Sequence, residues 1–282
     1  MKTKAAIKRP VLRYHGGKWK LAPWIISHFP THRIYVEPYG GAASVLMRKP
    51  RSYGEVYNDR DGDVVGLFRV LRDPKKSEQL KELLHTTPYA RDEFFAAYEY
   101  SAEPVERARR MVVRSFMGFG SASSSRDYVT GFRSNSNRSG TTPAQDWAHF
   151  SAHLDAFCAR LQGVTIENRD ALKVMHENDS EQTLHYVDPP YVHDTRNLTK
   201  NNHCYRYEMT DTDHVMLVKE LEQLKGYVVI SGYEHPIYLE LENRGWLAKH
   251  ISAFADGAKK RTEVLWLSPK VGAALNLNLF ST

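Results

Sequence analysis

The 282-residue chain is poor in cysteine: Cys158 and Cys204 are the only two, and no Cys-x-x-Cys pair occurs. Disulfide frameworks and thiolate zinc sites need several cysteines at close spacing, so neither is expected. No apolar run approaches the ~20 residues that cross a membrane. No apolar segment follows the lysine-rich start, as it would in a signal peptide. We therefore expect a protein without membrane contact, in a reducing compartment.

The sequence also lacks two cofactor signatures. It has no Gly-x-Gly-x-x-Gly fingerprint, which disfavours a dinucleotide-binding site, and no His-x-Glu with Pro-Cys-x-x-Cys, which excludes a zinc deaminase. The pairs His193-Asp194 and His203-Cys204 have no further ligand at zinc spacing. No metal is expected.

Positive charge is present in excess and is unevenly placed. The net charge is +6. Residues 1–20 carry seven Lys or Arg and no acid, and residues 107–140 carry seven Arg against Asp127 alone. Either run by itself is typical of a solvated surface. Two such runs, one of them entirely arginine, favour contacts with phosphates.

Strand and helix patterns alternate at both ends of the chain, which is typical of an α/β fold with a mostly parallel sheet. Strands are expected at 34–37, 55–58, 164–167, 183–187 and 227–230, with a closing antiparallel pair at 246–251 and 262–267. Helices are expected at 18–28, 42–47, 61–71, 75–85, 91–100, 103–116, 146–161, 170–176, 211–224 and 237–244.

The middle of the chain differs from both ends. It is mostly helical and contains a long loop, 118–142, rich in Ser, Gly, Asn and Arg. A loop of this length in a compact protein is commonly functional or disordered. We therefore predict a catalytic domain of residues 1–70 and 148–282, with a helical domain of residues 71–147 inserted into it.

The strip Asp188-Pro189-Pro190-Tyr191 follows a predicted buried strand. The amino group of adenine is a poor nucleophile because its lone pair is delocalised into the ring. The Asp188 carboxylate and the Pro189 carbonyl can accept its two N–H groups, since Pro190 has no N–H to compete. Tyr191 can stack on an extruded base. The alternative is a simple strand-ending turn, but the complete strip favours amino-group methylation.

Two glycine-containing segments suit a small ligand. Glu37-Pro38-Tyr39-Gly40-Gly41 follows a strand and precedes a helix, so the backbone can approach a ligand closely. Asp59 ends the next strand, where an acid can bind ribose hydroxyls. In Tyr14-His15-Gly16-Gly17-Lys18, Lys18 can meet the carboxylate of an amino-acid-like cofactor. Ordinary tight turns are the alternative for each segment taken alone.

Together these motifs resemble the DNA adenine methyltransferases of the Dam type, in the right order over nearly the whole chain. The matching segments are Tyr14–Lys18, Glu37–Gly41, Asp59, Asp170 in Asn168–Ala171, the strip at Asp188, and Lys260–Leu265. The resemblance implies a methyltransferase fold, a mostly parallel seven-stranded sheet with helices on both faces, and S-adenosylmethionine as methyl donor. The cofactor-binding residues that it implies are Tyr14, Lys18, Glu37, Pro38, Gly40, Asp59, Asp170 and Asp188.

The resemblance also implies that the helical insertion reads double-stranded DNA. Arg114–Gly120 and Gly131–Asn135 resemble the family's segments there, but the base-reading side chains do not carry over, so no recognition sequence is inferred. The candidate DNA contacts are Arg114, Arg126, Arg133, Asn135 and Arg138. We expect a monomer in solution, with room for more than one copy on DNA. The resemblance also implies the cytoplasm of a bacterial or phage-infected cell.

Other readings remain open at this point. An amino methyltransferase can act on RNA, cytosine or protein glutamine, although related cytosine enzymes usually begin the strip with Ser and glutamine enzymes with Asn. The basic insertion favours duplex DNA. A non-catalytic DNA-binding protein that keeps the methyltransferase fold is the other alternative. Adenine methylation in duplex DNA with base flipping is the hypothesis that the sequence favours.

Overall fold

One mixed sheet organises the residues that the computed structural model describes, 7–120, 129–134, 140–195, 205–254 and 260–279. Within them seven strands follow the order β3-β2-β1-β4-β5-β7-β6. All neighbours are parallel except β7, which runs antiparallel to β5 and β6. The fold class expected from the sequence is confirmed. The strands are β1 Ile34–Glu37, β2 Gly54–Asn58, β3 Val164–Glu167, β4 Thr183–Val187, β5 Tyr227–Gly232, β6 Leu247–Phe254 and β7 Lys260–Leu267.

Successive side chains of a strand point to opposite faces of the sheet. In the central strands both sets of side chains are apolar, so both faces of the sheet are apolar. In β4, Tyr186 joins one buried cluster and Val187 the other. In β7, Leu265 and Trp266 divide in the same way. Both faces of the sheet therefore need a layer of helices.

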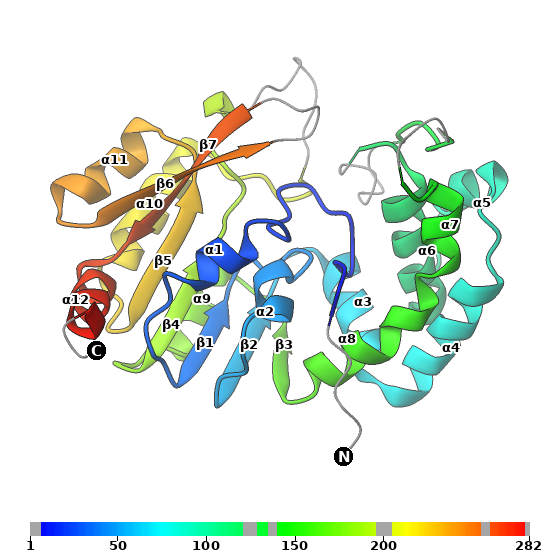
Figure 1. The fold of residues 1–282 in the computed structure, drawn as a ribbon, viewed down its shortest axis with the longest axis horizontal. Helices are drawn as coiled ribbons and strands as arrows, with labels where there is room; N and C mark the ends of the chain where they lie inside the picture. Colours follow the sequence, from blue (N-terminus) through cyan, green and yellow to red (C-terminus); the bar gives the residue numbers. More distant parts are fainter. Residues whose placement is uncertain (1–6, 121–128, 135–139, 196–204, 255–259, 280–282) are drawn as a thin grey trace.

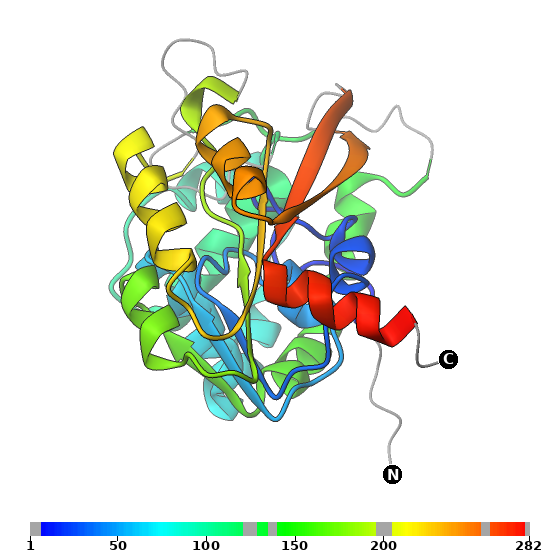
Figure 2. The same cartoon turned by 90° about the vertical axis from the view of Figure 1, so that its left-hand side faces the viewer.

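Figure 2 shows these two layers on either side of the sheet. One layer contains α1, α2 and α12, and the other contains α9, α10 and α11. The bounds are α1 Ala22–Ile26, α2 Ser44–Arg48, α9 Ala171–Glu177, α10 Asp211–Leu221, α11 Pro236–Asn243 and α12 Pro269–Leu279.

A helical lobe continues the molecule beyond the β3 edge (Figure 1). Helices α3 and α8 lie next to the sheet, and α4 to α7 lie farther out. A single buried cluster extends from Tyr57 of the sheet through Phe68 of α3 to Phe94 and Trp147 of the lobe. The lobe is therefore held by continuous apolar packing. The bounds are α3 Gly62–Arg72, α4 Pro74–Thr86, α5 Arg91–Ala96, α6 Pro104–Met117, α7 Pro143–Ala148, α8 Leu154–Leu161 and the 3₁₀ turns η2 Ser151–His153 and η3 His193–Thr195.

Local sequence determines where several of these helices begin. The Asp73 carboxylate accepts bonds from the first turn of α4, and Pro74 follows it. Glu103 and Pro104 start α6 in the same way, while Thr142 forms a capping box with Gln145 at α7. An acceptor satisfies the free N–H groups of a first turn, and proline needs no partner there.

Some expected boundaries were wrong. The helix expected at 146–161 is instead α7, η2 and α8, because Phe150 turns inward against Phe116. The helix expected at 18–28 shrinks to α1, and Lys18, which precedes it, lines the pocket described below. Helix α12, with Pro269 in its first turn, was not predicted.

Candidate active site

A pocket of about 240 Å³ lies where the carboxyl ends of β1 and β4 meet. Strand β1 pairs with β2 on one side and β4 on the other, so the strand order reverses there. Open α/β sheets bind ligands at such a reversal. Most of the residues predicted from the sequence to bind the cofactor line this pocket: Tyr14, Lys18, Glu37, Gly40, Asp59, Asp170 and Asp188, together with Pro190 of the strip.

Asp188 is held by two neighbours at the floor of the pocket. The Lys18 ammonium lies 3.0 Å from its Oδ1, and the Ser231 hydroxyl donates to the same oxygen at 2.6 Å. Burial alone would lower the pKa of Lys18, but the nearby Asp188 and Glu263 carboxylates outweigh it and raise the pKa. Lys18, expected to meet a cofactor carboxylate, therefore faces Asp188 as a buried cation in this structure.

Tyr191 is fixed next to this ion pair. Its hydroxyl donates to Glu263 Oε2 at 2.7 Å, and its ring meets the Tyr233 ring edge-on at 4.8 Å between centroids. The Lys18 Nζ lies 4.7 Å from the Tyr191 ring centroid. The side chain is buried, and Pro190, its neighbour in the strip, lines the pocket.

The loop after β1 needs glycine at two positions, at Gly40 for close packing and at Gly41 for its backbone angle. A Cβ on Gly40 would lie 2.1 Å from the Tyr57 ring, and Gly41 has a φ of 46°. The Gly41 N–H donates to Asp59 Oδ2 at 2.8 Å. Pro38 does not line the pocket, and its carbonyl accepts from the Asn58 amide at 2.8 Å. Small residues are therefore required for this loop to reach the end of β2.

Two carboxyls of the pocket have raised pKa values. Burial raises the pKa of Glu37 to about 8, although the Tyr35 hydroxyl and the Leu46 N–H both donate to it. Burial also raises the pKa of Asp59 to about 6, against its bonds from Asp61 and Gly41. At neutral pH Glu37 is thus mostly protonated, while Asp59 is mostly ionised and able to accept hydrogen bonds.

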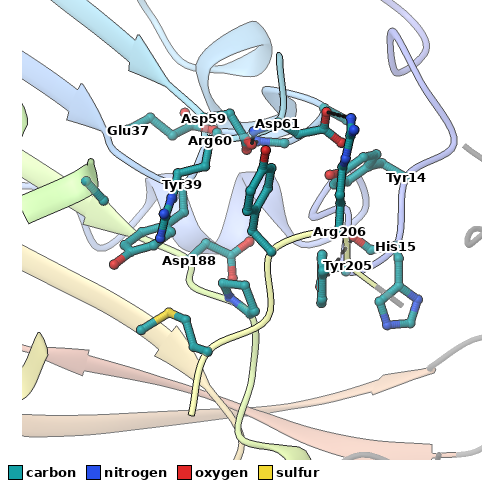
Figure 3. Close-up of a pocket in the computed structure, with 18 of the residues that line it drawn as sticks. Tyr14, His15, Glu37, Tyr39, Asp59, Arg60, Asp61, Asp188, Tyr205 and Arg206 are labelled. Carbon is teal, nitrogen blue, oxygen red and sulfur yellow. Dashed lines mark hydrogen bonds and ion pairs between the residues drawn. The ribbon is translucent and has the colours of Figure 1, made fainter. Parts of the chain in front are cut away.

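A strap formed by residues 205–209 covers one side of the pocket (Figure 3). The Arg206 guanidinium lies 3.6 Å from both Asp61 Oδ1 and Asp63 Oδ2, at the start of α3. The Tyr205 ring packs edge-on against His15 at 5.1 Å. The sequence suggested a mobile loop at 192–207 over the target base, of which 196–204 lie outside the described residues. The part at 205–207 lines the pocket. The ion pairs of Arg206 were not predicted, because no local motif joins it to Asp61.

The lining of the pocket is acidic in a protein whose net charge is positive. Seven carboxyl groups face three Lys or Arg side chains. The carboxyls are Glu37, Asp59, Asp61, Asp170, Asp188, Glu208 and Asp213, and the cations are Lys18, Arg60 and Arg206. Such a lining favours a cationic ligand over a polyanion.

Comparison with known families decides among the readings that the sequence left open. The family model for D12 class N6 adenine-specific DNA methyltransferases matches residues 14–249. The chain belongs to this family. A search of curated proteins found no match. The methyltransferase therefore acts on adenine in DNA, which selects DNA over the RNA alternative.

The pocket fits the methyl donor that methyltransferases generally use. S-adenosylmethionine carries a sulfonium and an ammonium against one carboxylate, so its net charge suits the acidic lining. Asp59 and Asp170 offer acceptors for hydroxyl and amino groups, and Lys18 is a cation in the lining that suits a carboxylate. The charges and hydrogen-bonding groups of the pocket therefore match those of this ligand.

Among the residues that the structure describes, neither a metal site nor a membrane span was found. In the described part of the chain, no three His, Cys, Asp or Glu side chains form a group that could hold a metal ion. Among the same residues, no helix has both the length and the apolar character needed to cross a bilayer.

The structure corrects one predicted DNA contact of the methyltransferase. Arg114 is 3% exposed, and its guanidinium donates to the Ala97 carbonyl inside the lobe. Its place on the inward face of α6 makes it a structural residue. Three of the other four, Arg126, Asn135 and Arg138, lie outside the described residues. Arg133 is half-buried in a short segment that pairs with the end of α6.

The arginines of α6 are also less available than their number suggested. Arg107 pairs with Asp63 of α3. Arg109 donates to Glu106 at 2.7 Å and to Glu93 at 2.9 Å, and Arg110 donates to Glu106 at 2.6 Å. These acids belong to the same lobe or to α3. Much of the charge in this part of the basic run therefore serves packing within the protein.

We predict that Gly40→Ala weakens S-adenosylmethionine binding at least tenfold, because the new Cβ would collide with the Tyr57 ring and displace the glycine loop. Calorimetric titration with the cofactor measures the change. Gly66→Ala is the matched control, since nothing lies within 4 Å of a Cβ there. This control should stabilise α3 by about 0.5–1 kcal/mol and leave binding unchanged. Equal cofactor affinity in the two variants would contradict the role assigned to Gly40.

We predict that Glu37→Gln gains stability over the wild type as pH rises. Folded Glu37 keeps its proton up to about pH 8, whereas the unfolded side chain loses it above about pH 4.5. The folded wild type therefore binds the extra proton and loses stability across this window, by about 1.4 kcal/mol per pH unit. Glutamine has no such dependence. Urea unfolding at pH 5, 6 and 7 tests this, and a difference independent of pH would contradict it.

Proposed function

We propose that the methyltransferase binds S-adenosylmethionine in the acidic pocket and methylates an adenine that is flipped out of duplex DNA. The observation that carries this proposal is the meeting of the glycine loop after β1 and Asp188 after β4 at one edge of the sheet. When bound, the donor supplies a methyl group activated by a positively charged sulfur. The protein residues have to hold and orient the two reactants.

Asp188 and Pro189 are the groups that orient the amine. The Asp188 carboxylate accepts one N–H of the target adenine, and the Pro189 carbonyl accepts the other. This pulls the nitrogen towards a tetrahedral shape and directs its lone pair at the methyl group. The Ser231 hydroxyl supports this role of Asp188, because its hydrogen bond to Oδ1 fixes the orientation of the carboxylate. Positioning of this kind accounts for much of a rate enhancement.

The pocket residues divide the work of holding the cofactor. Asp59, ionised at neutral pH, accepts ribose hydroxyls, and Asp170 at the start of α9 accepts the amino group of the cofactor's adenine. Tyr14, Glu37 and Gly40 shape the walls, and Pro38 supports the loop from behind. Lys18 moves from Asp188 to the cofactor carboxylate. Tyr191 stacks on the flipped base next to the strip.

Residues 71–147 form the part that reads DNA, on a protein that acts as a monomer. Support comes from the outer end of the lobe, where Phe119 is 72% and Val129 66% exposed on either side of the loop. Backbone bonds join Phe119 to Gly131 and Arg133 to Met117 at the base of this loop. An exposed aromatic on a basic loop suits contact with bases. Arg126, Asn135 and Arg138 belong to the same stretch of sequence.

We predict that Asp188→Asn lowers kcat by about 10²–10³-fold, because an amide cannot replace the charged acceptor. Tritium transfer into plasmid DNA from a host without adenine methylation measures the rate. DNA binding should stay within about threefold of the wild type. Asp155→Asn, an exposed carboxylate on α8, is the control and should be fully active. Turnover of Asp188→Asn near the wild-type rate would refute the proposed mechanism.

We predict that Arg133→Ala weakens binding to duplex DNA and lowers the slope of log K against log salt by about one. The Arg133 backbone bonds to Met117 and Tyr89 do not need its side chain, so the loop base should stay folded. Arg244→Ala, at an exposed position just after the end of α11, is the control. An unchanged salt slope in Arg133→Ala would remove this residue from the DNA interface.

A further inference from the structure

Glu263 is a buried carboxylate for which the proposed methyl transfer has no assigned use. It lies on β7 and is 8% exposed. Burying a carboxylate is costly unless hydrogen bonds or opposite charges compensate for it. Burial raises the pKa of Glu263, and the Lys18 cation and the Tyr191 and Tyr233 hydroxyls oppose that rise. Its partners are therefore Tyr191 of the strip and two neighbours of that ring, Lys18 and Tyr233.

The contacts of Glu263 converge on one ring. The Tyr191 hydroxyl donates to Glu263 Oε2 at 2.7 Å. Tyr233 meets the same ring edge-on, and the Lys18 Nζ lies 4.7 Å from its centroid. A hydroxyl oxygen held at one end and the backbone at the other fix χ1 and therefore where the ring lies. The Tyr233 and Lys18 contacts on its sides restrict rotation of the ring plane about χ2.

The sheet explains how Glu263 reaches Tyr191. Strand β5 lies between β4 and β7, and Ser231 of β5 pairs with Leu265 of β7. Asp188 receives its bond from Ser231, and Tyr191 receives its anchor one strand farther away. The strip after β4 is thus held at Asp188 by β5 and at Tyr191 by β7, the next two strands in the sheet.

We infer that Glu263 is a positioning residue for methyl transfer: its carboxylate anchors the Tyr191 hydroxyl and thereby holds the ring in place for the target adenine. This inference rests on the proposed role of Tyr191 as the stacking surface. A misplacement of about 1 Å near reacting groups can cost a hundredfold in rate. Loss of the anchor therefore lowers kcat, while cofactor affinity changes little.

Two substitutions separate the hydrogen bond from the charge. Glu263→Met has a similar length but no acceptor, whereas Glu263→Gln keeps an acceptor oxygen and loses only the charge. Tyr191→Phe removes the same hydrogen bond from the other side while keeping the ring. Tyr238→Phe is the matched control, because it deletes a buried tyrosine bond of 2.7 Å to His214 that lies outside the strip.

The experiment measures kcat and KM for tritium transfer into unmethylated plasmid DNA, with rates expressed per cofactor-binding site determined by calorimetry. We expect Glu263→Met and Tyr191→Phe each to lower kcat about tenfold or more. The double variant should be no slower than the slower single one, because both changes remove one interaction. Glu263→Gln should stay within about threefold of the wild type, and Tyr238→Phe should match it.

Two results would overturn the inference. One is a wild-type kcat in Glu263→Met. The other is multiplication of the two single effects in the double variant, which would mean that Glu263 does not act through Tyr191. Asp188→Asn in the same assay keeps the two claims apart. If it is inactive while Glu263→Met is fully active, only the role of Glu263 fails. If it is as active as the wild type, the proposed function itself fails.

Discussion

The parallel pairing of β1 with β4 is the constraint on which the site depends. It joins Val36 to His185 in register, so the loop that begins at Glu37 and the strip that begins at Asp188 leave the sheet side by side. These segments are about 150 residues apart in the chain, and neither forms a site alone. The strap at 205–209 lines the pocket at this edge of the sheet, and the helical lobe packs against the sheet beside it.

Charge is separated within the molecule in a way that suits two different ligands. The chain is basic overall, yet its pocket is lined mainly by carboxyls. A cationic methyl donor is favoured in the pocket, and we propose that DNA meets the arginine-rich stretch 118–142. Lys18 is the main exception, and it is buried against Asp188 with Glu263 nearby. The Asp188 carboxylate therefore has a buried counterion in this state.

The sequence was sufficient for the sheet and for most of the pocket, because strand periodicity and the motifs at Tyr14, Glu37 and Asp188 are local signals. It was insufficient where long-range packing decides the outcome. Arg114 looked available for DNA until its place on the inward face of α6 was known. The partners of Arg206 and the anchor of Tyr191 come from distant segments, so no spacing in the chain indicates them.

The central claim, that Asp188 and its strip methylate adenine in DNA, is tested most directly in cells. The protein would be expressed in a host without adenine methylation, and modified adenines would be mapped by single-molecule sequencing. With the wild-type protein we expect N6-methyladenine at nearly all copies of one short shared motif. With Asp188→Asn at the same expression level we expect only a small fraction of those copies to be methylated. Equal methylation of the motif by both proteins, or none with folded wild-type protein, would contradict this claim.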